Sequence, residues 1–231
     1  MLIYGIHGNG QTKNIFKTFK SIPIKTLELP GHGDTEKMDN YSIDNYATNL
    51  NKKVTEDGII IGHSLGGHIA LEMAQHNKNI KALILIAAPP INTEHMNDCF
   101  LPNPSIASIY NENPTDEELM AFIQEGSESR MYDKELLKMF KAQDPQARAG
   151  FAKSLGIRLD DEMQKLDHLS IPYHYFFGSK EKLINIEFMQ KLLNDKMTII
   201  EAGHNIMLDN INELEAKILD KLNKWNIELK S

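Results

Sequence analysis

Cysteine, long apolar runs and basic charge are all scarce in this chain of 231 residues, and each scarcity excludes a class of protein. The single cysteine, Cys99, excludes an intramolecular disulfide and is consistent with a reducing cytoplasm. No apolar run approaches the roughly 18 residues that a membrane-spanning helix requires, so we expect no membrane span. Residues 1–6 contain neither a basic leader nor a small-residue cleavage site, and we therefore expect no secretory signal.

The charge balance of the chain is acidic. Its 25 lysines and arginines stand against 32 aspartates and glutamates, giving a net charge of −7. This balance argues against nucleic acid as the main partner, because phosphate binding requires a basic surface. The length suits one substantial core and would be cramped for two independent domains. We therefore expect a cytoplasmic globular protein that acts on a small molecule.

Six short apolar runs, separated by helix-length stretches, indicate buried strands. They cover residues 2–6, 22–27, 58–61, 82–87, 173–177 and 197–200. Runs that are apolar on both faces and joined by long crossovers predict a parallel sheet covered by helices. Apolar stripes at helical spacing follow Ser42 and Ser64, and a further one starts at Ile211.

The interval between residues 87 and 173 contains no convincing strand. Thr115 and Glu118 fit a capping box, and Asp144-Pro145 fits a helix start with proline at the first helical position. We therefore predict a core made of residues 1–88 and 171–231, with residues 89–170 as a helical cap inserted after the fourth strand.

The segment Gly62-His63-Ser64-Leu65-Gly66 is a G-x-S-x-G motif with a strand before it and a helix after it. A nucleophile elbow requires this strand–turn–helix setting, in which only small residues fit beside the serine. The hydroxyl then lies at a helix N-terminus, where the helix dipole favours developing negative charge. A chance match is the alternative, and the flanking elements make it much less favourable. We predict Ser64 as a nucleophile.

Three segments together resemble the α/β-hydrolase superfamily, and within it the small carboxylesterase-like members. They are His7-Gly8-Asn9-Gly10, Leu29-Pro30-Gly31-His32-Gly33 and residues 62–67, each directly after a predicted strand. The resemblance implies an α/β-hydrolase fold that uses no cofactor and no metal. The family usually has a β-hairpin before the His-Gly strand, and this chain has no residues for one. We therefore expect a reduced sheet of six strands, in the family order 4-3-5-6-7-8.

In this fold the acid and the histidine follow the serine in the sequence. The histidines that qualify are His68, His76, His95, His168, His174 and His204. We expect those on the helix after Ser64 to point away from the ligand-binding end of the sheet, and those around the strand at 173–177 to lie at the wrong end or in the core. His204 comes a short turn after the last strand and matches the family's final Gly-His. We predict it as the general base; a solvated turn histidine is the alternative.

The resemblance also points to an acid and an oxyanion hole. The family usually has Gly-x-x-Asp after the strand at 173–177, and Glu181 occupies the aligned position. Glutamate is chemically sufficient, because the acid holds the imidazole tautomer and stabilises the imidazolium. The alternatives are that Glu181 is merely exposed between two lysines, or that Asp98 is the acid. The amides of Leu65 and Asn9 are the expected oxyanion donors, unless the loop containing Asn9 is only a tight turn.

Apolar side chains in the predicted cap suit either an acyl pocket or the internal core of small helices. They are Met96, Phe100, Met120, Phe122, Met131, Met139 and Phe140. A charged substrate would require a convergent arginine, for which Arg130, Arg148 and Arg158 are available.

The sequence thus favours a serine hydrolase that cleaves small carboxylic esters or thioesters through an acyl-enzyme. One alternative is a lyase of the same fold, resembling the menaquinone-pathway enzyme that eliminates pyruvate. That family typically has an arginine directly after the elbow glycines, where this chain has His68. This difference makes the lyase hypothesis less favoured than the hydrolase. A catalytically weak, hydrolase-like ligand receptor is the other alternative.

Overall fold

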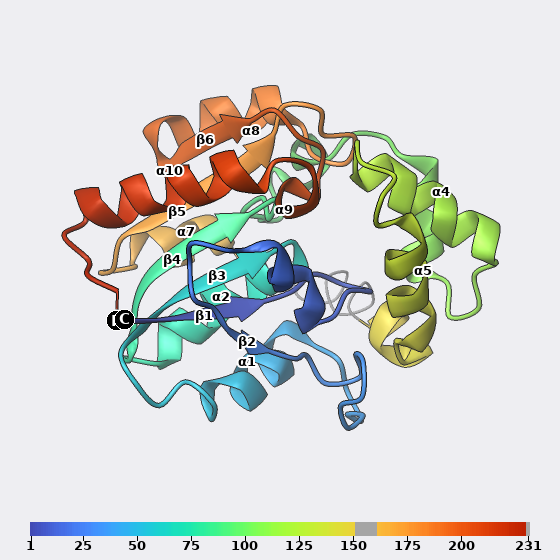
Figure 1. Cartoon of the computed structure of the whole chain (residues 1–231), viewed down its shortest axis with the longest axis horizontal. Coiled ribbons are helices and arrows are strands. Elements are labelled where there is room, and N and C mark those ends of the chain that lie inside the picture. The colour runs from blue at the N-terminus through green and yellow to red at the C-terminus, as the bar shows by residue number, and fades with distance from the viewer. Residues whose placement is uncertain (151–160, 230–231) are drawn as a thin grey trace.

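Six strands form one parallel sheet in the computed structural model, which describes residues 1–150 and 161–229 (Figure 1). They are β1 (Leu2–Ile6), β2 (Lys25–Leu27), β3 (Gly58–His63), β4 (Ile80–Ile86), β5 (Tyr173–Gly178) and β6 (Met197–Ile200). Their order is β2-β1-β3-β4-β5-β6, and every pairing is parallel. Both the strand number and the order confirm the sheet predicted from the sequence.

Strand β2 is shorter than predicted, because it begins at Lys25 rather than at Ile22. Pro23 has no amide hydrogen to give to a neighbouring strand. The amide of Ile22 donates instead to the Glu215 carboxylate at 2.9 Å. Glu215 belongs to helix α10 (Ile211–Lys224), which in this way holds the chain just before β2.

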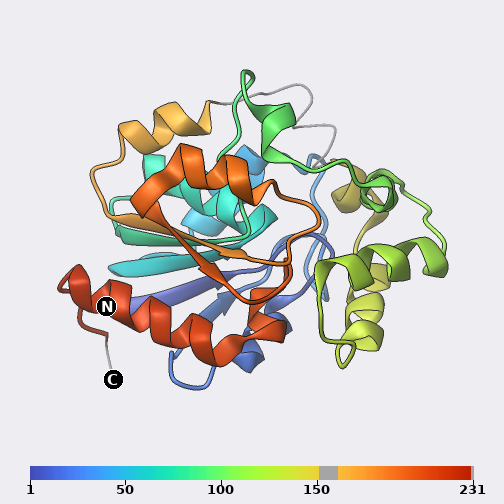
Figure 2. The same cartoon turned by 90° about the horizontal axis from the view of Figure 1, so that it is seen from above.

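Helices cover both faces of the sheet. Helices α1 (Ile43–Asn51), α2 (Leu65–His76) and α8 (Ile186–Leu193) lie on one face and α10 on the other (Figures 1 and 2). Three right-handed crossovers that run in the same direction along the sheet bring α1, α2 and α8 to one face. The short elements are η1 (Lys13–Thr18), η3 (Asn194–Lys196) and α9 (Ile206–Asp209). No helix in the described ranges is long and apolar enough to cross a bilayer.

The described part of the chain between β4 and β5 is helical, as predicted. It contains α3 (Met96–Cys99), η2 (Pro104–Tyr110), α4 (Asp116–Gly126), α5 (Asp133–Ala142) and α7 (Glu162–Asp167). The capping box predicted at Thr115 and Glu118 begins α4, and helix resumes at Pro145. Helices α4 and α5 lie beside the carboxyl ends of the strands (Figure 1). Residues 151–160 of the predicted cap, with Arg158, lie outside the described residues.

Candidate active site

Ser64 lies directly after β3 and is the N-cap of α2. Its φ of 50° is in the left-handed region that serine rarely adopts, and its amide is held by the Ile86 carbonyl at 2.8 Å. The glycines of the motif are required by space, since a Cβ on Gly62 would lie 2.4 Å from the carbonyl oxygen of Gly66. This sharp turn presents the Ser64 side chain at the carboxyl edge of the sheet.

His204 and Glu181 come from the two loops that follow β6 and β5 at the same edge. His204 Nδ1 lies 2.8 Å from Glu181 Oε1, and the Glu181 side chain is fully buried. The loops approach closely because residue 178 is glycine: a Cβ there would lie 2.2 Å from the Ala202 carbonyl oxygen. A neutral imidazole that donates from Nδ1 to a carboxylate has an unprotonated Nε2. The arrangement therefore leaves Nε2 of His204 able to accept a proton.

Asp98, the other acid considered, lies on α3 with an exposed side chain. Its carboxylate is 3.9 Å from the ring of His95. His174 is buried in β5, where its Nε2 lies 2.8 Å from Thr198 Oγ1. Burial lowers the pKa of His174 to about 4.

His68 lies differently from the sequence expectation. It lines the same pocket as Ser64, so the prediction that it points away from the ligand-binding end was wrong. The reason is the position of α7, which packs on α2 and contacts His68 Nδ1 through the Glu162 carboxylate at 3.0 Å. This contact depends on a segment far away in sequence, so the helical periodicity of α2 could not reveal it.

The amides of Asn9 and Leu65 lie on two segments that meet at Ser64. A Cβ on Gly8 would be 3.1 Å from Ser64 Cβ, so the loop that follows β1 contacts the turn at Ser64. Leu65 is the first residue of α2, where amides have no acceptor within the helix. Neither amide has an acceptor among the residues that the structure describes. Two unpaired N–H groups beside a serine side chain are of the kind that can stabilise an oxyanion.

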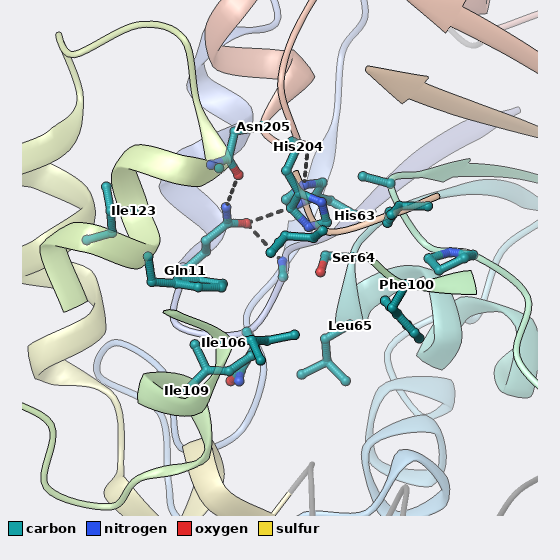
Figure 3. Close-up of a pocket in the computed structure, with 18 of the residues that line it drawn as sticks. Gln11, His63, Ser64, Leu65, Phe100, Ile106, Ile109, Ile123, His204 and Asn205 are labelled. Carbon is teal, nitrogen blue, oxygen red and sulfur yellow. Dashed lines mark hydrogen bonds between the residues drawn. The ribbon is translucent and has the colours of Figure 1, made fainter. Parts of the chain in front are cut away.

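Three polar residues at this site, Gln11, His63 and Asn205, were missed by the sequence analysis. Gln11 Nε2 donates to Asn205 Oδ1 at 2.8 Å, and Gln11 Oε1 lies 2.9 Å from His63 Nδ1 (Figure 3). His63 Nε2 lies 3.1 Å from the carbonyl oxygen of His204. The pKa of His63 is lowered to about 3, mainly by burial and secondly by the neighbouring His204, so this ring is neutral. The available signal was a glutamine inside a glycine-rich loop.

The loop that carries His204 is also bonded to the segment after α4. The Asn205 amide donates to the Gly126 carbonyl at 2.8 Å. The Asp209 carboxylate accepts the Gly203 amide at 2.8 Å and the Ser129 amide at 2.9 Å. The end of α4 is therefore hydrogen-bonded to the loop that carries His204, called the histidine loop below.

A pocket at this edge contains Ser64 and His204 together with an apolar wall (Figure 3). Isoleucine and phenylalanine side chains dominate that wall: Ile91, Phe100, Ile106, Ile109, Phe122, Ile123, Phe140 and Ile184. The methionines considered for an acyl pocket lie elsewhere; Met139, for example, faces a second groove between α5, η1 and α9. No group of three or more histidine, cysteine or acidic side chains that could hold a metal occurs among the described residues.

Comparison with known proteins identifies the family. The model of the alpha/beta hydrolase family matches residues 5–216, and the chain belongs to this family. A mutant of the N-acyl homoserine lactonase AidH, bound to N-hexanoyl homoserine, shares the fold with a TM-score of 0.87 and 21% identity, over 99% of this chain and 91% of that one. An esterase from Exiguobacterium antarcticum has a TM-score of 0.80 and 15% identity, over 96% and 92% of the two chains.

Curated relatives include an ester-cleaving enzyme and a synthase. The pimeloyl-[acyl-carrier protein] methyl ester esterase of Pseudoalteromonas atlantica is 25% identical in an alignment that covers 86% of this chain and 85% of that protein. The 2-succinyl-6-hydroxy-2,4-cyclohexadiene-1-carboxylate synthase of Pectobacterium atrosepticum is also 25% identical, over 88% and 85%. The esterases among the relatives support a hydrolase that cleaves esters.

Proposed function

We propose that this protein is a serine hydrolase that cleaves small carboxylic esters or thioesters through an acyl-enzyme. Ser64 is the nucleophile, His204 the general base and Glu181 the acid that orients it. The observation that carries the proposal is the 2.8 Å contact between the buried Glu181 carboxylate and Nδ1 of a histidine that lines the same pocket as Ser64. This set of contacts matches the roles that a catalytic triad requires.

The proposed reaction begins when Ser64 Oγ attacks the carbonyl carbon and His204 Nε2 takes the hydroxyl proton. The resulting oxyanion accepts hydrogen bonds from the amides of Asn9 and Leu65. His204 then gives the proton to the departing alkoxide or thiolate, which leaves an ester of Ser64. Water, deprotonated by His204, hydrolyses that ester and releases the carboxylic acid. Glu181 stabilises the imidazolium in both halves of the reaction.

The pocket lining favours a substrate with an uncharged acyl group. Among the described residues that line it, there is no lysine, arginine, aspartate or glutamate. A carboxylate bound by these described residues would lose its hydration without gaining a lysine or arginine partner from them, which is costly. The product in the synthase's name carries two carboxylates, so the lining supports ester cleavage over that reaction. Arg130 and Arg148 do not line the pocket.

Kinetics with p-nitrophenyl butyrate test the proposal. We expect Ser64→Ala and His204→Ala each to lower kcat by about 10⁴-fold or more, because nucleophile and base act as a unit. Wild-type protein should also be labelled at Ser64 by a fluorophosphonate, detected as one adduct by intact mass. Ser21→Ala, before β2 and away from the pocket, is the matched control and should retain full activity.

If Ser64→Ala retained most of the activity, the assignment of Ser64 as the nucleophile would be wrong. An unlabelled wild-type protein without esterase activity would instead support the binding-protein alternative.

A further inference from the structure

We propose that Gln11 is a positioning residue for the proposed reaction: its amide fixes the Asn9 loop, the ring of His63 and the His204 loop in one arrangement. The inference rests on the proposed function and concerns a residue that touches none of the reacting atoms in the proposed mechanism. Gln11 is 4% exposed and lies in the turn after β1, where its backbone N–H donates to the Gly8 carbonyl at 3.3 Å. Figure 3 shows its side chain between the three segments.

The orientation of the Gln11 amide is determined by its partners. The Gly8 amide donates to Gln11 Oε1 at 3.0 Å, and a backbone N–H is only a donor. Oε1 must therefore face Gly8, and Nε2 must face Asn205, to which it donates at 2.8 Å. Exchange of the two atoms would set donor against donor at Gly8, so the side chain has a single favourable orientation.

The backbone N–H of Gln11 contacts the peptide unit that carries the Asn9 N–H, whereas its side chain holds the preceding unit through the Gly8 N–H. The Gly8 carbonyl oxygen lies 2.9 Å from His7 Nδ1 and accepts a hydrogen bond from the backbone N–H of Gln11. In a trans peptide the N–H is directed opposite to the carbonyl, so the Asn9 N–H points away from these two groups. The side chain and the backbone N–H of Gln11 thus hold the two successive peptide units that meet at Gly8. Donors that are oriented before the reaction require no reorganisation when the oxyanion forms.

His63 transmits the contact to the loop that carries the base. A neutral imidazole has one N–H, and both groups that face His63, Gln11 Oε1 and the His204 carbonyl, are acceptors. The ring therefore donates to only one of them at a time and packs against the other. Asn205, directly after His204, is bound by Gln11 as well. Gln11 thus contacts the base loop by a direct route and by a route through His63.

The arrangement predicts separate effects for two substitutions. Gln11→Met keeps the length of the side chain and removes its hydrogen bonds to Gly8, His63 and Asn205, while the backbone bond to the Gly8 carbonyl remains. The three segments then lose the side chain that aligns them. Misplacement of reacting groups by about 1 Å can cost about 100-fold in rate, and we expect kcat to fall by roughly 10- to 100-fold with KM changed less than threefold. Gln11→Glu retains the acceptor for Gly8 and adds a negative charge beside the histidines. Its acidic limb of kcat/KM should move to higher pH, because the charge stabilises a protonated ring.

The experiment measures kcat, KM and the pH profile for p-nitrophenyl butyrate, with thermal unfolding as a check of folding. Gln75→Met, on the part of α2 remote from the pocket, is the control and should match the wild type in all three. Fluorophosphonate labelling of wild type tests the nucleophile separately. If wild type is labelled and both Gln11 variants are labelled at the wild-type rate with an unchanged pH profile, the inference is wrong while the proposed function stands. If wild type itself is not labelled, both fail.

Discussion

At the scale of single residues, Glu181 is a buried carboxylate between two lysines. Its side chain is fully buried, whereas that of Lys180 is 45% exposed. A buried carboxylate is tolerated only when it is paired or hydrogen-bonded, and its partners here are His204 Nδ1 and the Leu183 amide. Burial of this one residue in a charged segment indicates that its contacts, and not the local sequence, determine its position.

Glu181→Gln tests that contact. The amide can occupy the same space but has no charge to stabilise an imidazolium, so kcat should fall by roughly 10²- to 10⁴-fold, less than for His204→Ala. Steady-state kinetics with p-nitrophenyl butyrate measure the effect. Asp98→Asn, on the exposed face of α3, should leave kcat unchanged. The opposite pattern, a silent Glu181→Gln and an inactive Asp98→Asn, would identify Asp98 as the acid.

At the scale of elements, α5 separates the pocket from the second groove. Leu136 lines both, whereas Met139 lines only the groove. Phe140, one turn after Leu136, packs on the loop that follows β1. A Cβ on Gly10 of this loop, whose φ is +71°, would lie 2.1 Å from the Phe140 ring. One helix therefore contacts the glycine-rich loop and contributes Leu136 and Phe140 to the pocket wall.

We expect Leu136→Ala to open this wall and to favour longer acyl chains. The ratio of kcat/KM for octanoyl to that for acetyl p-nitrophenyl esters should rise by about tenfold, since each buried methylene contributes about 0.8 kcal/mol. Leu137→Ala, the adjacent residue that lines neither cavity, is the matched control. Met139→Ala alone should not change the preference. An unchanged ratio in Leu136→Ala would show that acyl chains do not reach α5.

Elements with local signals were predictable, and contacts between distant segments were not. Every strand was found from short apolar runs, and the start of α4 from Thr115 and Glu118. The serine's setting followed from its glycines and flanks. Gln11 and Asn205, in contrast, are 194 positions apart, and nothing in either segment indicates the other. The directions of His68 and Met139 were likewise set by packing between helices.

At the scale of the whole molecule, buried histidines make the fold sensitive to acid. Burial lowers the pKa of His32 and His63 to about 3 and that of His174 to about 4, against an ordinary value of 6.5. The unfolded chain therefore binds more protons than the folded one between these values. We therefore expect the contribution of these histidines to stability to be fully present above pH 6.5 and to be lost as the pH falls toward 3.

His174 allows this to be tested away from the candidate site. His174→Gln removes the titrating ring and keeps a polar group near Thr198. We expect the free energy of unfolding of wild type to fall more between pH 7 and pH 4.5 than that of the variant, by up to about 3 kcal/mol. Urea unfolding at the two pH values measures the difference. Parallel losses in both proteins would exclude His174 as a source of the acid sensitivity.

The bonds between the end of α4 and the histidine loop have a consequence for exchange of amide hydrogens with solvent. The amides of Gly203 and Asn205 are donors to Asp209 and Gly126, and Asp209 also holds the Ser129 amide. Movement of α4 away from the sheet must break the Asn205 bond, so helix displacement and deprotection of the loop are one opening event. A ligand that holds α4 down should therefore slow deuterium uptake in residues 203–205, even without touching them.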